Sequence, residues 1–450
     1  MDGVILPTLA TVSSDLRVSR LQKSPERRQK AIAFAVPPIF GRRGMQFLLL
    51  MVAVAFAAYA RVTVSPLQEA LKVSLGLSDN EIALLQGPAL ALPFVMAAVP
   101  LGLLIDRCSR VHLVLTFAVF DMGCSLLTAV APNFVLLFAT RCLLGLSAFA
   151  VNPVALSLIA DLYAPSQRGR ATMVLAIGQF AGISAAFGLG GSLLAISGFD
   201  GNGWRWTMLG LTCPLAPVVL LTLMMRDPQR TELMIRRPSV RDAWVELWRY
   251  RAMIAPLLIG LLMIEIAIGA VMVWTTPTLA RSFRLSPDHI GAIMSMCVMV
   301  SGTLGPIAGG PLADLCQRAG GPRQTASLLS VLSLLSVPSA VFAVVPTATL
   351  VSVLLVTYMT IINAMLVMGT TLYIVVVPGE LRGLCLAMLA GACVLFGIGL
   401  APLTVSLLSG AMGGSAMIGK ALASICVLTT LLCAATFGFG RRYFARVVAH

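Results

Sequence analysis

Charged residues are scarce in this sequence. Only 11% of its 450 residues are Asp, Glu, Lys or Arg, whereas 58% are hydrophobic and the mean hydropathy is +0.94. A soluble core does not need so much apolar sequence, so the composition predicts a polytopic membrane protein. The apolar stretches are continuous rather than alternating with a period of two, which favours membrane-spanning helices over a β-barrel.

Histidine is rare and cysteine is dispersed. The three His residues are far apart, and the ten Cys residues form no Cys-x-x-Cys pair, which argues against a metal cluster and a disulfide framework. No glycine-rich phosphate loop opens a helix, and no cluster of His, Cys and carboxylates lies at the end of an apolar stretch. We therefore expect no cofactor, no metal and no enzyme activity.

Twelve apolar segments are present, each near or above the roughly 20 residues that a membrane-spanning helix requires. They cover residues 45–66, 81–105, 112–130, 134–160, 171–196, 207–225, 253–277, 289–313, 325–345, 348–377, 384–409 and 417–438. This predicts five regions: a basic tail (1–43), a first six-helix half (44–225), a basic linker (226–252), a second six-helix half (253–438) and a second basic tail (439–450).

Basic residues outnumber acidic ones, with 32 Lys and Arg against 18 Asp and Glu and a formal net charge of +14. Most of them fall in the tails, the linker and alternate connecting loops, so they share one side of the predicted membrane. The positive-inside rule places that side, and both termini, in the cytoplasm. The excess charge then orients the protein and contacts anionic lipid headgroups, and we expect no nucleic-acid binding.

The tails and the linker are polar and basic. We expect residues 1–43 to form a mostly disordered cytoplasmic tail. In the linker, Ser239–Asp242 reads as a helix start, and Trp244, Leu247 and Trp248 follow at helical spacing. This predicts a short helix that either lies at the membrane interface or packs on the cytoplasmic loops.

One short connector is repeated. Residues 102–110 read Gly-Leu-Leu-Ile-Asp-Arg-Cys-Ser-Arg between the second and third apolar segments, and Gly310 and Asp314 occupy the equivalent place in the second half. Gly102 is expected to let two helix ends approach closely. Two copies in register indicate a duplicated transporter. The pattern resembles the signature loop of the major facilitator superfamily, which implies twelve transmembrane helices in two six-helix halves.

Four ionisable residues lie well inside the apolar segments: Arg61, Asp121, Arg141 and Glu265. Each costs on the order of 2.5–3.5 kcal/mol at the centre of a span, so such residues are candidates for function. Arg141 opens an Arg-x-x-x-Gly pattern similar to the superfamily motif whose Arg lines the central cavity. Asp121 falls on a segment outside that cavity, so we expect a structural role for it, with a pairing to Arg141 as one option.

Glu265 lies near the middle of the seventh segment. A carboxyl at this depth suits a proton carrier, and it equally suits a counter-ion to Arg141 or Arg61. Arg61 is near the outer end of the first segment and can either line the cavity or reach the surface. Weaker candidates for the cavity are uncharged polar residues, more often used in helix packing: Tyr59, Gln86, Asn152, Gln179, Trp274, Asn363 and Tyr373.

The superfamily resemblance also implies a gate on the cytoplasmic side. Asp106 and Arg110 would meet Asp161 and Arg168 there in the outward-facing state. The wider group of predicted gate residues comprises Gly102, Asp106, Arg107, Arg110, Asp161, Arg168, Gly310 and Asp314.

Several stretches resemble the spinster-like branch of the superfamily: residues 75–82, 100–110, 157–171, 204–206 and 226–228. Characterised members of that branch export lysolipids or sphingoid phosphates. The branch usually carries Asp-Arg in the first segment and a Glu seven residues after the fourth-segment Arg, but this sequence has Ala60-Arg61 and Ala148 there. Both arginines remain without those acids, so we expect an anionic or zwitterionic amphiphilic substrate drawn to Arg61 and Arg141.

The sequence therefore predicts a monomeric secondary transporter that moves a small organic solute across the plasma membrane, with the bacterial inner membrane as the expected location. Protons are a candidate coupling ion, and membrane lipids are expected partners. Two alternatives stay open: a non-transporting sensor or partner-binding protein with the same fold, and a proton antiporter for drugs or metabolites.

Overall fold

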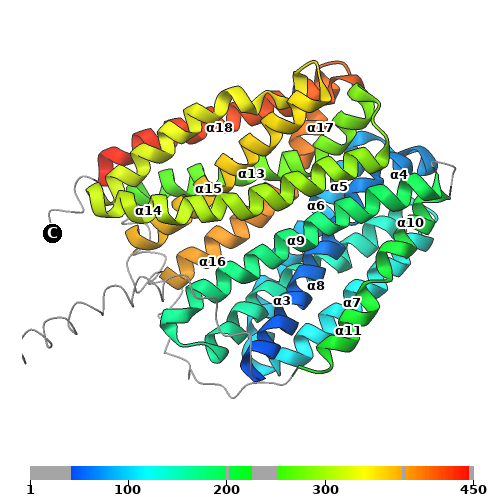
Figure 1. Ribbon diagram of the computed structural model, residues 1–450, viewed down its shortest axis with the longest axis horizontal. Helices are drawn as coiled ribbons and strands as arrows, with labels where there is room; N and C mark the ends of the chain where they lie inside the picture. The colour runs from blue at the N-terminus through cyan, green and yellow to red at the C-terminus, as the bar shows by residue number, and fades with distance from the viewer. Residues whose placement is uncertain (1–41, 199–201, 226–250, 378–381, 445–450) are drawn as a thin grey trace, which may run out of the picture.

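The computed structural model describes residues 42–198, 202–225, 251–377 and 382–444, and the regular elements in these ranges are helices (Figure 1). Residues 1–41, 199–201, 226–250 (the linker with its expected helix), 378–381 and 445–450 lie outside the described residues. Helices dominate because the hydrocarbon core offers no water to backbone groups, so each span must satisfy its own hydrogen bonds.

The N-terminal half contains the first six predicted spans. Its elements are α3 (Arg42–Val62), η1 (Ser65–Leu67), α4 (Gln68–Leu75), α5 (Asp79–Gln86), α6 (Pro88–Arg107), α7 (Arg110–Val130), α8 (Phe134–Leu162), α9 (Pro165–Ser197), α10 (Gly203–Thr212) and α11 (Leu215–Thr222). Two predicted spans are each built from two helices, α5 with α6 and α10 with α11.

The C-terminal half contains the other six. Its elements are α13 (Arg251–Phe283), α14 (Pro287–Ala340), η2 (Phe342–Val344), α15 (Ala348–Val376), α16 (Arg382–Ala392), η3 (Cys393–Leu400), α17 (Ala401–Ala411), η4 (Ser415–Met417) and α18 (Ile418–Phe444). η3 is a π-helix within the eleventh span.

Twelve crossings result, as predicted. The described chain has eleven helices long and apolar enough to span a membrane, but one of them, Pro287–Val344, is 58 residues long. That is more than twice the length that a crossing needs. Its backbone leaves helical geometry at Gly320 and Gly321, where Gly321 has a φ of 64°, so this helix is two spans joined by a sharp turn.

The second span is broken at Gly87. α5 ends at Gln86, Gly87 adopts a non-helical conformation, and Pro88 opens α6. Proline at the first position of a helix loses no hydrogen bond, because its missing N–H would have no partner there. A Cβ at Gly87 would lie 2.4 Å from the carbonyl oxygen of Gly399 in η3, so the break lies against the π-helix of the other half.

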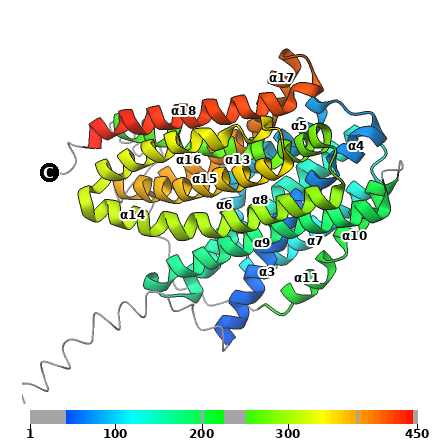
Figure 2. The same ribbon diagram turned by 45° about the horizontal axis from the view of Figure 1, so that its top comes forward.

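The bundle has two distinct ends (Figures 1 and 2). The short elements α4, α5 and α10 gather at one end, and the C-terminus lies at the other. We name the first the Arg281 end, after a residue in the last turn of α13. We name the second the Arg110 end, after the first residue of α7, which follows the turn at Cys108 and Ser109.

Small residues bring α9 and α14 together across the two halves. A Cβ at Gly191 would lie 2.8 Å from the Cα of Gly291, and one at Gly188 would lie 3.2 Å from the Oγ of Ser295. Ser184 Oγ also lies 2.8 Å from Ser295 Oγ, so this contact includes a hydrogen bond. The glycine-rich face of α9 is therefore a packing face in this structure.

Candidate functional site

A cavity of about 400 Å³ lies between the two halves. Its walls come from α3, η1, α5, α6, α8 and α9 on one side and from α13, α14, α15, α16 and η3 on the other. The volume is near the lower end of the range for small-molecule sites. The predicted cavity residues that line it are Arg61, Gln86, Asn152, Gln179, Glu265 and Asn363.

Arg61 is the cationic group of the cavity wall. It lies in the last turn of α3, and its guanidinium carbon is 4.6 Å from the centre of the Phe149 ring. The aromatic face attracts the cation and holds the planar group in place. The backbone oxygen of Arg61 accepts a hydrogen bond from Arg141 Nη2 at 2.7 Å, which fixes the main chain at the same point.

Glu265 is the acidic group of the same cavity and lies on the opposite half. α13 carries it against the π-helix η3, where a Cβ at Gly397 would lie 2.8 Å from the Cβ of Glu265. Only a glycine at position 397 leaves room for this approach. The positive charge of Arg61 attracts the negative charge of Glu265 across the interface of the two halves.

A chain of hydrogen bonds closes the cavity toward the Arg281 end. Ser65 Oγ donates to Gln86 Oε1 at 2.5 Å, Gln86 Nε2 donates to Gln68 Oε1, and Gln68 Nε2 donates to the backbone oxygen of Val273 at 2.7 Å. The last bond crosses from α4 to α13, and hence between the halves. Ser65 and Gln68 were not predicted, because they lie at or just beyond the end of the first apolar segment and carry no motif.

The two walls differ in chemistry. The N-terminal half contributes Arg61, Gln86, Asn152 and Gln179. The C-terminal half contributes Glu265, Ser301 and Asn363, but most of its wall is apolar, with Ile268, Met272, Val298, Met359, Leu366 and Ile398. The described residues contain no group of three His, Cys, Asp or Glu side chains arranged to hold a metal ion.

Arg141 and Tyr59 lie behind the cavity wall, and their prediction as cavity-lining residues is corrected here. Arg141 is 1% exposed, donates to the Arg61 backbone and leaves Nε and Nη1 without a partner among the described residues. Tyr59 is also buried and donates its hydroxyl to the backbone oxygen of Leu211 at 2.8 Å. Tyr59 is two residues from Arg61, so the two point to different faces of one helix.

Trp274 and Tyr373 are helix-packing residues. Trp274 Nε1 donates to the backbone oxygen of Pro402 at 2.8 Å, and the Tyr373 hydroxyl donates to that of Cys385 at 3.2 Å. Both aromatic side chains are buried. Their polar atoms are satisfied within the C-terminal half, which is the common use of such residues in membrane helices.

Asp121 is buried in the N-terminal half and accepts a hydrogen bond from Ser147 Oγ. Ser147 lies on α8, so the bond joins α7 to α8. The expected structural role fits this position, but the partner is a serine rather than the Arg141 that we considered. The charge of Arg61 also acts on Asp121.

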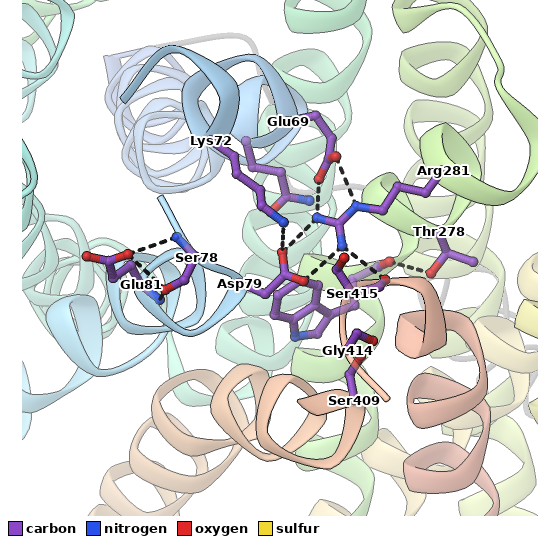
Figure 3. A network of polar contacts seen from close by, with 12 residues as sticks. Glu69, Lys72, Ser78, Asp79, Glu81, Thr278, Arg281, Ser409, Gly414 and Ser415 are labelled. Atoms are coloured by element: carbon purple, nitrogen blue, oxygen red, sulfur yellow. Dashed lines mark hydrogen bonds and ion pairs between the residues drawn. The ribbon is translucent and has the colours of Figure 1, made fainter. Parts of the chain in front are cut away.

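A network of charges joins the halves at the Arg281 end (Figure 3). Arg281 donates to both carboxylate oxygens of Glu69, at 3.0 and 2.7 Å, and to both of Asp79, at 3.0 and 2.8 Å. Lys72 Nζ lies 2.5 Å from Asp79 Oδ1, and Arg281 Nη1 contacts the backbone oxygen of Ser415 at 3.4 Å. The planar guanidinium therefore binds two carboxylates at once, each through two hydrogen bonds, which a lysine cannot do.

Replacing Arg281 by Gln is expected to open this end. The negative charges of Glu69 and Asp79 would then be balanced by Lys72 alone. Each lost hydrogen bond to a charged group stabilises the closed end by at most about 1.5–3 kcal/mol. We expect at least about a tenfold rise in the population open at the Arg281 end. The measurement is the labelling rate of Ser65→Cys in intact cells, with an impermeant thiol reagent and the natural cysteines replaced.

Arg284→Gln is the matched control, because Arg284 is an exposed arginine three residues away. It should leave the labelling rate of Ser65→Cys unchanged. Equal rates in the Arg281 and Arg284 variants would show that the network does not hold this end closed.

At the Arg110 end, the described bonds of three predicted gate residues, Arg110, Asp161 and Arg168, lie within the N-terminal half. Arg110 Nη1 forms an ion pair with Asp161 Oδ2, which joins α7 to α8. Arg168 donates to the backbone oxygens of Ala160 at 2.7 Å and Tyr163 at 3.2 Å. These bonds tie the start of α9 to the end of α8.

The predicted close approach at Gly102 is wrong for this structure. A Cβ at Gly102, or at Gly310 in the second half, would meet nothing within 4 Å. The turn is made instead by Cys108 and Ser109, nearly two helical turns later, where Ser109 caps α7. Arg107 and Asp314 are exposed, and the side chain of Asp106 lies outside the described residues.

The Major Facilitator Superfamily model matches residues 50–402. No curated protein matches the sequence. Among solved structures, a bacterial homologue of the human lysosomal transporter Spinster is similar in fold in two inward-facing conformations. The unoccupied one has 20% identity over 90% of this chain and 98% of its own, with a TM-score of 0.78. The occupied one has 20% identity over 90% and 96%, with a TM-score of 0.71.

More distant transporters share the same fold. The nucleoside transporter NupG, in a mutant form, has 14% identity over 87% of this chain and 99% of its own, with a TM-score of 0.66. A D-xylose–proton symporter has 14% identity over 86% and 96%, with a TM-score of 0.65. The family match covers well over half of the sequence, and the structure supplies the two six-helix halves, so the chain belongs to the major facilitator superfamily.

Proposed function

We propose that this protein moves a small organic anion with an apolar part across the membrane by alternating access. Its family consists of secondary transporters rather than enzymes. The observation that carries the proposal is a cavity of about 400 Å³ to which both halves contribute. A site shared by two halves can be exposed to either side when one half rocks against the other.

The chemistry of the two walls supports an amphiphilic solute. Arg61 and the amides Gln86 and Gln179 on the N-terminal wall suit an anionic group with several hydrogen-bond acceptors. The aliphatic and methionine side chains of the C-terminal wall suit an alkyl or aryl part. The modest volume favours a short amphiphile, or the head group and first carbons of a longer one.

The described contacts between the halves support an inward-facing state. Arg281, Gln68 and Ser184 bond across the interface, and all of them lie toward the Arg281 end. We place this end outside and the Arg110 end in the cytoplasm, because basic residues concentrate in the tails, the linker and the loops of the Arg110 end. We further propose that the protein is a monomer in the bacterial inner membrane.

The open space at Gly102 and Gly310 fits the same scheme. When the cytoplasmic side closes, a helix of the opposite half can approach the backbone at Gly102 and Gly310, because neither position has a side chain. Arg110, Asp161 and Arg168 hold the helix ends beside Gly102 in place. The predicted gate is therefore proposed to close in the outward-facing state.

Counterflow in proteoliposomes tests the proposal without assuming a direction of transport. Vesicles loaded with unlabelled octyl sulfate, a permanent anion, should take up labelled octyl sulfate much faster than protein-free vesicles. Octyltrimethylammonium, with a similar chain and the opposite charge, should be excluded. Exchange of the cation alone would favour a drug antiporter, and binding without exchange would favour a sensor.

A further inference from the structure

We propose that Glu265 competes with the anionic substrate for Arg61, and that binding of a proton to Glu265 releases Arg61, so that anion and proton cross together. This inference rests on the proposed function and adds its coupling ion. Arg61 and Glu265 are the two charged side chains among the described residues that line the cavity. They come from opposite halves, on α3 and α13.

The cavity wall already carries a cation, Arg61, and an anion, Glu265. The charge of Arg61 is attracted by Glu265 across the interface. A second negative charge beside Arg61 shares a space of about 400 Å³ with the Glu265 carboxylate. Like charges so close in a low-dielectric site repel strongly, and the repulsion is removed when one of them binds a proton.

The other titratable side chains near Glu265 are cysteines and tyrosines. Cys393 of η3 lines the same cavity. On α15, Tyr358 contacts Thr430 and Tyr373 bonds to a backbone oxygen. On α18, the Cys433 thiol donates to the backbone oxygen of Gly260. None of these groups bonds to Glu265 among the described contacts.

The remaining titratable groups on elements packed against α13 lie elsewhere along the bundle. Glu69 and Lys72 of α4 belong to the network at Arg281. On α14, Asp288 and His289 contact each other in the first turn, and Cys297 is buried. The other titratable residues of α14 lie toward the turn at Gly320: Asp314, Cys316, Arg318 and Arg323. On α18, Lys420, Cys426, Arg441, Arg442 and Tyr443 complete the set. Arg61 is thus the charged group in the described chain that acts on Glu265.

The proposed transport cycle moves one proton with each solute molecule and leaves the solute chemically unchanged. A proton from the compartment that the cavity faces forms an O–H bond with the Glu265 carboxylate. Arg61 then pairs with the anionic group of the solute, which the Glu265 charge no longer repels. After the halves rock, solute and proton leave on the other side, and the Arg61–Glu265 interaction returns. For a monoanion, no net charge crosses the membrane.

Binding of octyl sulfate at a series of pH values tests the inference on the full-length protein. Its sulfate does not titrate in the working range, so any pH dependence belongs to the protein. In the wild type, affinity should fall about tenfold per pH unit once Glu265 is ionised, the slope of one linked proton. In Glu265→Gln the affinity should be independent of pH, and at high pH it should exceed the wild type at least tenfold.

Proton uptake by proteoliposomes is the second readout. Octyl sulfate entry should carry about one proton per anion in the wild type and none in Glu265→Gln. Glu265→Asp should restore the pH slope, which a merely structural residue would not do. Asp121→Asn, which removes a buried carboxyl outside the cavity, should keep the slope.

The outcomes separate the two proposals. If the wild type neither binds nor exchanges octyl sulfate, the proposed substrate class fails and the inference fails with it. If it exchanges octyl sulfate with no proton and no pH slope, the function stands and the inference is overturned. A slope that disappears in Asp121→Asn instead would assign the proton to Asp121 and also overturn it.

Discussion

A disulfide between positions 188 and 295 is expected to stop transport completely and reversibly. A Cβ at Gly188 lies 3.5 Å from the Cβ of Ser295, within the range of about 3.5–4.5 Å that disulfides need. Gly188 is on α9 and Ser295 on α14, so the bond joins the two halves. Because the halves must separate here in the opposite state, Gly188→Cys/Ser295→Cys should lose octyl sulfate counterflow on oxidation and regain it on reduction.

A matched pair in the same protein controls for oxidation itself. A Cβ at Gly438 lies 4.0 Å from the Cβ of Ser330, but both residues belong to the C-terminal half. Gly438→Cys/Ser330→Cys should therefore cross-link and retain counterflow, with the natural cysteines replaced in both variants. Full activity of the oxidised 188–295 protein would show that this contact persists throughout the cycle and would contradict rocking about the cavity.

The number and position of the spans follow from the sequence because the bilayer imposes one length and one secondary structure. The predicted segment 134–160 corresponds to α8 (Phe134–Leu162), and the predicted segment 81–105 corresponds to α5 with α6. Helix ends were less predictable where charges flank a span. The fifth helix starts at Pro165 rather than 171, since Arg168 bonds to the preceding helix end and need not enter the hydrocarbon.

The site was predictable in composition but not in detail. Charges inside spans marked Arg61 and Glu265 as candidates because a charge is costly there, and both side chains line the cavity. Whether a charged side chain lines the cavity or lies behind its wall depends on the neighbouring helix. Arg141 and Asn152 are three helical turns apart and share a face of α8, yet the backbone of Arg61 covers Arg141 while Asn152 reaches the cavity.

The π-helix η3 had no signal that separates it from an ordinary helix. Its residues form a continuous apolar run, and the only hint is the pair Gly397 and Gly399. A Cβ at Gly397 would approach Glu265, and one at Gly399 would lie 2.9 Å from the Cβ of Ala91. The distortion thus depends on contacts with α13 and α6, which are tertiary and cannot be inferred from local sequence.

Arg61→Gln is expected to remove recognition of the anionic group. Losing one partner of a partly buried charge pair costs about 2–5 kcal/mol, so octyl sulfate affinity should fall at least about 30-fold. An octyl sulfobetaine, which carries a compensating positive charge, should lose much less. Isothermal calorimetry on the detergent-purified protein measures both ligands under one condition.

Arg61→Lys and Arg141→Gln show which property of Arg61 matters. Lys keeps the charge but loses the planar contact with Phe149 and the bidentate geometry, so its affinity should fall between those of Arg and Gln. Arg141→Gln removes an equal charge from behind the wall, together with one hydrogen bond to the Arg61 backbone. Its effect should be only a few-fold, because a positioning residue acts through Arg61. A larger loss in Arg141→Gln than in Arg61→Gln would mean that the anion binds at Arg141, and the cavity would have to rearrange to expose it.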